Sequence, residues 1–385
     1  MNSSLAGDDA SLFQGVNDQC ESTNCRPGAN DSCGISEGES RATFLENLMS
    51  YDNLYDAMLK CSRGVTWKPS VKFFLLKAPQ EIEKMHNDIL SGKWKNGTPR
   101  KIQIVYPKRR EGMAISFKDR IYQRVLNDLI LYPCMTKHFI RDNCACQKGK
   151  GYDYAHNRLK KQLWQHYCKY GYTGYIVQID VHQYYQSMRH DEVKACFAKY
   201  VPAEAQQLIF DVLDQQYQGD VGYFPGSQMV QIAGISFLNG VDHYIKEVLK
   251  VQHYLRYMDD FHLIAPTKEK ALLWVKEIKA QLENLGLTIS EKKTRIIPIN
   301  QSWVFLGIRY TMDSDGAVHT RLTSQNIRHE KRKLKKMINR AKKGLMTKEK
   351  VDECYTSWKA HANKATCKET IIKMDEYYNK LWETV

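Results

Sequence analysis

Three aspartates have the spacing and surroundings of a buried catalytic cluster. Asp259 and Asp260 are adjacent in "HYLRYMDDFHLI" (253–264), whose apolar flanks are typical of the arms of a buried hairpin. Asp180 ends the apolar run "TGYIVQID" (173–180), which is typical of a buried strand. If strand and hairpin are neighbours in one sheet, the three carboxylates converge, and their like charges need a counter-ion.

Divalent metal ions are the counter-ions that suit such a cluster best. Mg²⁺ prefers carboxylate oxygens and keeps coordination positions open for phosphate, so we expect a pair of ions about 3.5–4 Å apart. That pair favours phosphoryl transfer as the reaction class. The competing interpretation is that the two adjacent aspartates form a solvated turn. A four-residue sequence such as "YMDD" (257–260) also occurs by chance at an appreciable rate, so alone it is moderate evidence for a metal site. The apolar arms favour the metal site.

The elements that must position these aspartates predict an α+β fold. Alternating or apolar runs predict strands at 100–107, 173–180 and 253–264, and near 287–290, 294–299 and 303–310. Helical spacing predicts helices at 44–58, 116–135, 190–199, 203–217, 229–249 and 267–285. This order fits helices packed on one face of a small antiparallel sheet, with Asp180 beside the hairpin tip.

The charge distribution indicates a partner that carries phosphate. Lys and Arg total 57 against 43 acidic residues, which gives a formal net charge of +14. The first 42 residues are acidic, so the positive excess lies in the remainder. Its densest part is 328–343, with nine basic residues and one acid, Glu330. A nucleic-acid backbone is the partner that this pattern favours.

Membrane insertion and secretion are not expected from the sequence. No apolar run approaches the roughly 20 residues that cross a bilayer, and the N-terminus lacks the features of a signal peptide. A cytoplasmic location with reduced cysteines follows. Cys20, Cys25 and Cys33 lie in an acidic arm (1–42), but their spacing does not match paired zinc-ligand motifs. We therefore expect an arm that a partner can order.

Several segments resemble the motifs of reverse transcriptases. "YMDD" and "QIDVHQYYQS" (178–187) are similar to the active-site motifs of that family. Five further segments resemble its remaining motifs in the same order: "PKRREGMAISFKDRIYQ" (107–123), "DNCACQKGKGYDYA" (142–155), "PGSQMVQIAG" (225–234), "LGLTISEKKT" (285–294) and "WVFLGIRY" (303–310). The resemblance covers roughly 90–385 and is strongest to stand-alone prokaryotic members of the diversity-generating and defence-associated groups.

This resemblance implies a right-hand polymerase fold. We expect an N-terminal arm over 1–42, helices and fingers over 43–172, a palm with the small antiparallel sheet over 173–310, and a basic helical thumb over 311–385. The thumb would contact the duplex backbone without sequence preference. The chain leaves no room after the thumb for an RNase H, maturase or endonuclease domain, so a stand-alone enzyme is expected.

The family's catalytic roles fall on the three aspartates. Asp180 and Asp259 would ligate two Mg²⁺ ions, with Mn²⁺ as the alternative ion, while Asp260 would be more peripheral and the Val181 carbonyl would add a ligand. One ion would lower the pKa of the primer 3′-hydroxyl, and the other would hold the triphosphate of the incoming dNTP. Lys293 corresponds to the lysine that protonates pyrophosphate, although the sequence leaves Lys292 open as the alternative.

Other family roles concern the nucleotide and the primer. Lys108 and Arg110 would close over the triphosphate. Tyr185 would exclude a ribose 2′-hydroxyl and so select dNTPs, against the alternative of a core tyrosine. Gln228 and Gln231 are available to contact the nascent base pair. The primer-grip turn would be formed by Phe305, Leu306 and Gly307. Val230 departs from the family pattern, which has serine at this position.

The leading hypothesis is an RNA-templated DNA polymerase that copies a dedicated non-coding RNA, in antiviral defence or in diversity generation. The implied partners are the template RNA, the DNA product and dNTPs, with a second copy of the chain or an accessory protein as a further candidate. One alternative is a catalytically silent RNA-binding assembly subunit, which the three aspartates argue against. A second alternative is a polymerase with unusual template use. A third is a polymerase that makes RNA, which Tyr185 and Met258 disfavour.

Overall fold

The computed structural model describes residues 40–105 and 109–383, apart from the side chain of Arg110. The chain divides into two compact units. The first comprises 1–148, 181–244 and 280–288, and the second comprises 149–180, 245–279 and 289–385. Four of the residues singled out by the sequence lie outside the described part: Cys20, Cys25, Cys33 and Lys108.

The first unit is helical apart from one two-stranded antiparallel sheet, β1 (Arg100–Ile104) with β2 (Arg110–Ala114). Its helices are α1 (Arg41–Leu48), α2 (Tyr51–Ser62), α3 (Pro69–Leu76), α4 (Ala78–Leu90), α5 (Phe117–Leu126), the π-helical turn η2 (Asn127–Leu131), α6 (Tyr132–Thr136), α8 (Tyr184–Ser187), α9 (His190–Ala198), α10 (Ala203–Gln216), α11 (Gln228–Phe237) and α12 (Asn239–His243). Ser116 caps α5 and Ser227 caps α11, each by accepting a backbone N–H of the first turn.

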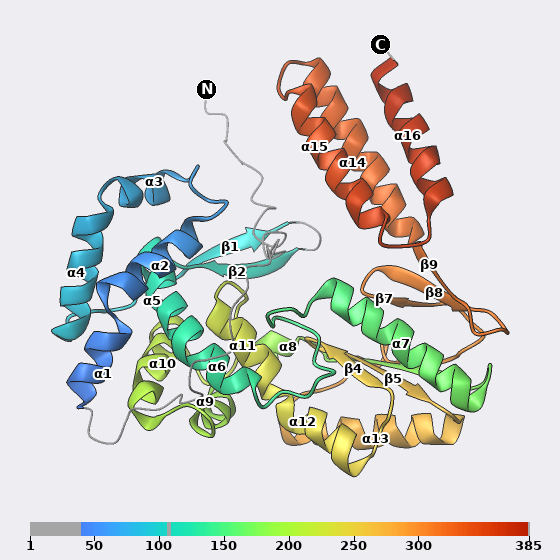
Figure 1. Ribbon diagram of the computed structural model, residues 1–385, viewed down its shortest axis with the longest axis horizontal. Coiled ribbons are helices and arrows are strands. Elements are labelled where there is room, and N and C mark those ends of the chain that lie inside the picture. The colour runs from blue at the N-terminus through green and yellow to red at the C-terminus, as the bar shows by residue number, and fades with distance from the viewer. Residues whose placement is uncertain (1–39, 106–108, 384–385) are drawn as a thin grey trace, which may run out of the picture. The chain divides into compact units, whose positions relative to one another are not determined.

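The second unit is built around a four-stranded antiparallel sheet in the order β4-β5-β3-β6 (Figure 1). These strands are β3 (Tyr175–Asp180), β4 (Tyr254–Tyr257), β5 (Asp260–Ala265) and β6 (Arg295–Pro298). Every residue of β5 after Asp260 is buried, as expected of a central strand covered on both faces. Helix α7 (Tyr152–Tyr170) packs on β4 and β5.

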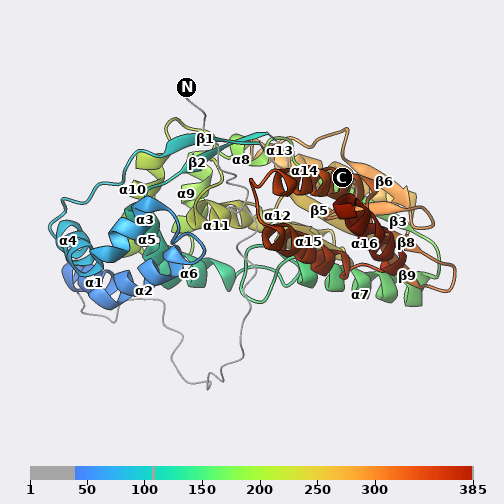
Figure 2. The same cartoon turned by 90° about the horizontal axis from the view of Figure 1, so that it is seen from above.

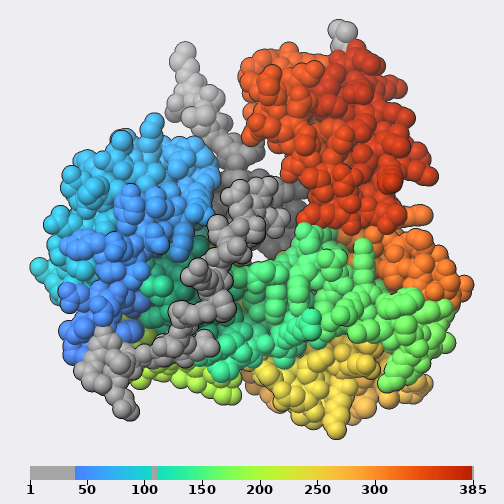
Figure 3. All heavy atoms as spheres, in the orientation of Figure 1, coloured from blue at the N-terminus to red at the C-terminus, as the bar shows by residue number. Residues whose placement is uncertain are grey.

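A second sheet and a helical group complete this unit. The sheet is antiparallel, with β7 (Trp303–Phe305), β8 (Ile308–Met312) and β9 (Val318–Leu322) in sequence order. The remaining helical elements are η3 (Tyr244–Val248), α13 (Lys268–Asn284), α14 (Ser324–Lys342), α15 (Lys348–Ala362) and α16 (Lys368–Glu383). Helix α14 contacts both α15 and α16. The three lie side by side in Figures 1 and 2, and their atoms form the orange-to-red group in Figure 3. None of the described helices is long and apolar enough to span a membrane.

Some of the expected elements differ in the structure. The strand expected near 287–290 is wrong, because only two backbone hydrogen bonds pair this segment with the end of β3, His182 N–H to Thr288 O and Ser290 N–H to Asp180 O. The helix expected at 229–249 is interrupted at Leu238. The sequence-based assignment also missed the short strands β2 and β9.

Candidate functional site

The structure places two of the three aspartates directly opposite each other. Asp180 is the last residue of β3 and Asp260 the first of β5, and the two are register partners in the antiparallel pair. Like charges in directly opposite positions destabilise a sheet unless a cation lies between or beside them. Asp260 is exposed, whereas Asp180 and Asp259 are half-buried. A positive charge at this end of the sheet would therefore offset the repulsion between the carboxylates.

The turn that carries Asp259 has an unfavourable backbone conformation. Tyr257 and Asp260 close the β4–β5 hairpin as a register pair, so Met258 and Asp259 form a two-residue loop. Met258 has a φ of +56°, a left-handed conformation in which glycine is usually found at such a turn. Strain of this kind persists where the surroundings enforce it, and it is concentrated at functional sites.

A lysine supplies the cation that the aspartates require. Lys293 Nζ donates to both carboxylate oxygens of Asp180, at 2.8 and 3.0 Å. The hydrogen bond to Asp180, together with the negative charges of Asp180, Asp259 and Asp260, raises the pKa of Lys293 above its ordinary value. The three carboxylates therefore act on one ammonium group. Both Lys292 and Lys293 are exposed, and it is Lys293 that makes this contact.

The donor set of this site fits magnesium. Among residues 40–105 and 109–383, no three Asp, Glu, His or Cys side chains are grouped so as to hold a metal ion by themselves. Magnesium rarely uses such protein cages, because it binds through one or two carboxylates and completes its shell with water and substrate phosphate. Asp180 and Asp259 provide the carboxylates, and the ammonium of Lys293 shows that a cation is stable beside them.

A buried arginine supports the strained turn. Arg256 lies on β4 with none of its surface exposed, and its Nη1 donates to the carbonyl oxygen of Met258 at 2.7 Å. Hydrogen bonds from a charged donor are stronger than neutral ones. Since Met258 directly precedes Asp259, this contact fixes the backbone from which the Asp259 carboxylate projects. The sequence analysis missed this residue, although a lone arginine within an apolar strand was the available signal.

Replacing Arg256 by methionine should therefore destabilise the protein. Arg256→Met keeps the length of the side chain but leaves the Met258 carbonyl without its charged donor, which should lower the free energy of unfolding by about 2 kcal/mol. Urea denaturation measures this change. Arg309→Met is the matched control, because Arg309 is exposed on β8, and it should change the stability by less than about 0.5 kcal/mol. Equal effects of the two substitutions would contradict a special role for Arg256.

The segment expected to grip the primer forms a two-residue hairpin turn. Phe305 and Ile308 are register partners of β7 and β8, with Leu306 at φ +45° and Gly307 at φ +80° between them. Positive φ at both positions defines the tight turn type that suits twisted hairpins. A side chain added at Gly307 would meet no atom within 4 Å, so the outer face of the turn is open.

This hairpin is connected to β3 and β5 by two contacts. The ring of Phe305 packs edge-on against His262 of β5, with centroids 5.1 Å apart. Gln178 of β3 donates to the Val304 carbonyl at 2.7 Å. His262 is completely buried, and burial lowers its pKa to about 3, so the imidazole is neutral at physiological pH. The turn at Leu306 and Gly307, which is expected to grip the primer, and the aspartates are thus parts of one packed unit.

A separate group of expected residues lies in the first unit. Tyr185 of α8 lies against Gly234 of α11, where an added Cβ atom would come within 2.8 Å of the tyrosine hydroxyl oxygen. Gln228 and Gln231 are half-buried in the first turn of the same helix, three residues apart and therefore on one face. Val230, the departure from the family pattern, is fully buried. Glycine at position 234 thus sets the position of the Tyr185 ring.

The structure does not describe the side chains of Lys108 and Arg110, the two basic residues expected to hold the triphosphate. Arg110 begins β2, but its side chain, like all of Lys108, lies outside the described part of the chain. The next residues of β2 pack closely on the loop before α11. An added Cβ at Gly226 would lie 2.3 Å from the Met113 carbonyl oxygen, so this approach requires glycine.

Comparisons with known proteins agree with these motifs. The family described as reverse transcriptase (RNA-dependent DNA polymerase) matches residues 107–310, which is more than half of the chain. No curated protein matches it. Among solved structures, apo telomerase from Candida tropicalis, truncated from its C-terminal domain, is similar over 59% of this chain, with 14% identity and a TM-score of 0.44. The similarity spans 55% of that telomerase chain.

Proposed function

The chain belongs to the reverse transcriptase family, and from this premise we propose that it extends a 3′-hydroxyl with dNTPs on an RNA template. The family and the enzyme class expected from the sequence, an RNA-directed DNA polymerase, are confirmed at the level of the family. The α+β class is confirmed by the small antiparallel sheets with their helices, and the right-hand polymerase fold by the family match.

The observation that carries the proposal is the cluster of carboxylates and lysine at the end of β3 and β5. Asp180 and Asp259, with the Val181 carbonyl, would hold two magnesium ions, and Asp260 would add negative charge at the periphery. Bound magnesium supplies a lowered pKa for a coordinated hydroxyl and neutralises phosphate charge. Lys293, whose ammonium contacts Asp180, would donate a proton to the pyrophosphate that leaves, which is general-acid catalysis.

The remaining residues would position the two strands and the nucleotide. We assign fingers to 43–172, the palm to 173–310 and a basic thumb to 311–385. The turn at Leu306 and Gly307 would contact the primer backbone, and its packing through Phe305 and His262 supports a fixed distance to the aspartates. Lys108 and Arg110 would hold the triphosphate, while Gln228 and Gln231 would contact the nascent base pair.

The template and the biological setting belong to the proposal too. We propose a dedicated non-coding RNA as template, used in antiviral defence or in diversity generation. The basic helix α14, which carries most of the 328–343 cluster, supports a nucleic-acid partner because exposed lysines and arginines bind backbone phosphate. Primer extension on a defined RNA template, with Mg²⁺ and either dNTPs or NTPs, tests the polymerase itself. Failure to incorporate dNTPs under these conditions would overturn the proposal.

Tyr185 should determine the choice between dNTPs and NTPs. Tyr185→Ala removes the ring that would collide with a 2′-hydroxyl, so the preference for dNTPs should fall by about 10²-fold. Single-nucleotide incorporation with dNTP and NTP, compared as kcat/KM ratios, measures it. Tyr185→Phe keeps the ring and should retain the preference of the wild type. A wild-type enzyme that prefers NTPs would contradict the assignment.

A further inference from the structure

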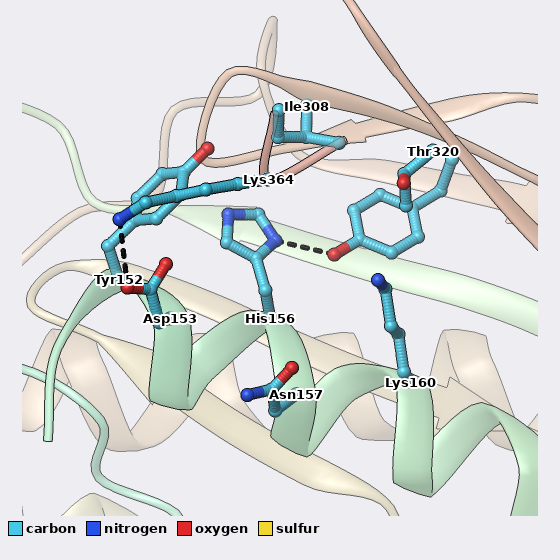
Figure 4. A pocket seen from close by; sticks show the side chains of 9 residues that line it. Tyr152, Asp153, His156, Asn157, Lys160, Ile308, Thr320 and Lys364 are labelled. Carbon is cyan, nitrogen blue, oxygen red and sulfur yellow. Dashed lines mark hydrogen bonds and ion pairs between the residues drawn. The ribbon is translucent and has the colours of Figure 1, made fainter. Parts of the chain in front are cut away.

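A cavity of about 210 Å³ lies in the second unit, apart from the aspartates (Figure 4). Helix α7 contributes Tyr152, His156 and Lys160 to its wall, the three-stranded sheet contributes Tyr310, and the connection between α15 and α16 contributes Lys364. Nothing in the proposed polymerase reaction uses this space. Most of the polar groups that line the cavity are hydrogen-bond donors.

The first donor is the ring of His156, which is only 8% exposed. Its Nδ1 is hydrogen-bonded to the hydroxyl of Tyr310. Burial raises the pKa of Tyr310, so the phenol keeps its proton, and we assign its O–H as the donor to Nδ1. Burial also lowers the pKa of His156 to about 4, so the imidazole is neutral and its single proton lies on Nε2.

That Nε2–H group has no hydrogen-bond partner among the residues that the structure describes. In Figure 4 it points away from its Tyr310 bond, toward the side of the cavity where Tyr152 and Lys364 lie. The Tyr152 hydroxyl is a second buried donor without a partner in the described part of the chain. Buried polar groups are normally satisfied, so two orphaned donors in one cavity indicate that a ligand completes them.

The charges of the wall identify the chemistry of that ligand. Lys160 and Lys364 are cationic, and Asp153 is the acid among the lining residues. Asp153 is already paired with Lys364 at 2.8 Å, in an exposed ion pair that an incoming anion can compete with. Two donors without partners among the described residues and two lysines favour an anionic hydrogen-bond acceptor. In nucleic-acid complexes, lysine and tyrosine side chains and N–H groups donate hydrogen bonds to phosphate oxygens, so we take phosphate as this acceptor.

The volume allows more than a bare anion. Since one water occupies about 30 Å³, the cavity has room for about seven waters, which suffices for a phosphate with part of a sugar.

The cavity also lies beside two segments of the expected polymerase site. The His156 ring packs edge-on against Phe305 of the expected primer grip at 5.5 Å, and Tyr257 of the catalytic hairpin is close enough to affect the Tyr152 hydroxyl.

We propose that this cavity is a phosphate-binding site in which His156 Nε2–H, the Tyr152 hydroxyl and Lys364 hold the anion, with Lys160 adding positive charge from the side of Tyr310. The phosphate comes either from the backbone of a nucleic-acid strand or from a free phosphate. The proposal does not rest on polymerase activity, because the donors are present whatever reaction the aspartates perform. A bound phosphate would pack behind the primer-grip turn through His156.

Titration with inorganic phosphate tests the site directly. In protein labelled with ¹⁵N only at histidine, the His156 Nε2 resonance, assigned from its loss in His156→Gln, should shift in a saturable way. Tyr152→Phe and Lys364→Ala should each raise the dissociation constant by about tenfold, since each removes one hydrogen bond to an anion. Lys161→Ala is the matched control, because Lys161 is exposed on the same helix, and it should bind like the wild type.

Two outcomes would overturn the proposal: a His156 resonance that does not respond to phosphate, or equal affinity in wild type, Tyr152→Phe and Lys364→Ala. Tyr152→Phe keeps the result interpretable, because it removes a hydroxyl without a described partner and should leave the fold at least as stable. Unfolding curves of the variants check this.

A dinucleotide pair distinguishes the two sources of phosphate. Thymidylyl-thymidine carries one charged phosphodiester, and its methylphosphonate analogue has the same sugars and bases without that charge. If the site takes a strand backbone, the charged dinucleotide shifts the His156 resonance and the neutral one does not. If inorganic phosphate binds and neither dinucleotide competes, the ligand is a free phosphate; either result supports the site.

Discussion

Asp259→Asn should reduce DNA synthesis by about 10³-fold, which corresponds to roughly 4 kcal/mol of transition-state stabilisation. The substitution keeps the shape of the side chain but removes the negative charge that would hold the metal ions. Asp180→Asn should cause a similar loss, because Asp180 lies at the end of β3 beside the same ions. Asp260→Asn should have a smaller effect, since its carboxylate is exposed at the edge of the cluster.

Steady-state incorporation of dNTPs on a primed RNA template measures these losses, with Asp56→Asn as the matched control. Asp56 is exposed on α2 in the first unit, so its variant should keep wild-type activity. The folded state should tolerate all the cluster substitutions, because each one reduces repulsion between neighbouring carboxylates. An Asp259→Asn enzyme with wild-type activity and an intact fold would contradict the assignment of the active site.

Lys293→Gln should slow the chemical step by about 10²-fold, whereas Lys292→Gln should have little effect. General-acid catalysis typically contributes 10²–10⁴-fold, and only Lys293 bonds to Asp180. The adjacent lysines have the same local sequence, charge and backbone, so the pair isolates the position of the ammonium. Rapid-quench measurement of single-nucleotide incorporation separates the chemical step from product release. Equal losses in both variants would point to general electrostatics instead.

The pH dependence provides a second test of Lys293. The hydrogen bond to Asp180 and the surrounding carboxylates raise the pKa of Lys293, and magnesium ions held by the same carboxylates would offset part of this effect. A general acid works in its protonated form, so kcat/KM should fall as pH rises through the pKa of Lys293. Lys293→Gln should lack that decline. A wild-type profile with the same alkaline limb as the variant would exclude Lys293 as its origin.

The central features of the site were predictable from local sequence. An acidic pair between apolar arms predicts a hairpin tip, and an apolar run that ends in aspartate predicts the neighbouring strand; the register of β3 and β5 then places Asp180 opposite Asp260. The Leu306–Gly307 turn was expected from the resemblance of "WVFLGIRY" (303–310) to a family motif; glycine accepts the positive φ of such a turn, whereas the positive φ of Leu306 was not predicted.

Other features depend on contacts between distant segments, which a single sequence does not reveal. Strand β2 contains charged residues and a glycine and exists through pairing with β1, so its own propensity is weak. The 287–290 segment has strand-like composition but no ladder partner beyond the end of β3. Arg256 is charged by type and buried by context, and the cavity at His156 is assembled from α7, β8 and the α15–α16 connection.

Sequencing the nucleic acid bound to the purified protein, before and after addition of Mg²⁺ and dNTPs, tests the central claim most directly. We predict a discrete RNA in both samples and, after dNTP addition, DNA complementary to it that the Asp259→Asn protein does not make. Neighbouring DNA would then identify the setting: a template and variable repeat pair indicates diversity generation. Bound RNA without any DNA product in the wild type would contradict the account and identify the chain as an RNA-binding assembly subunit.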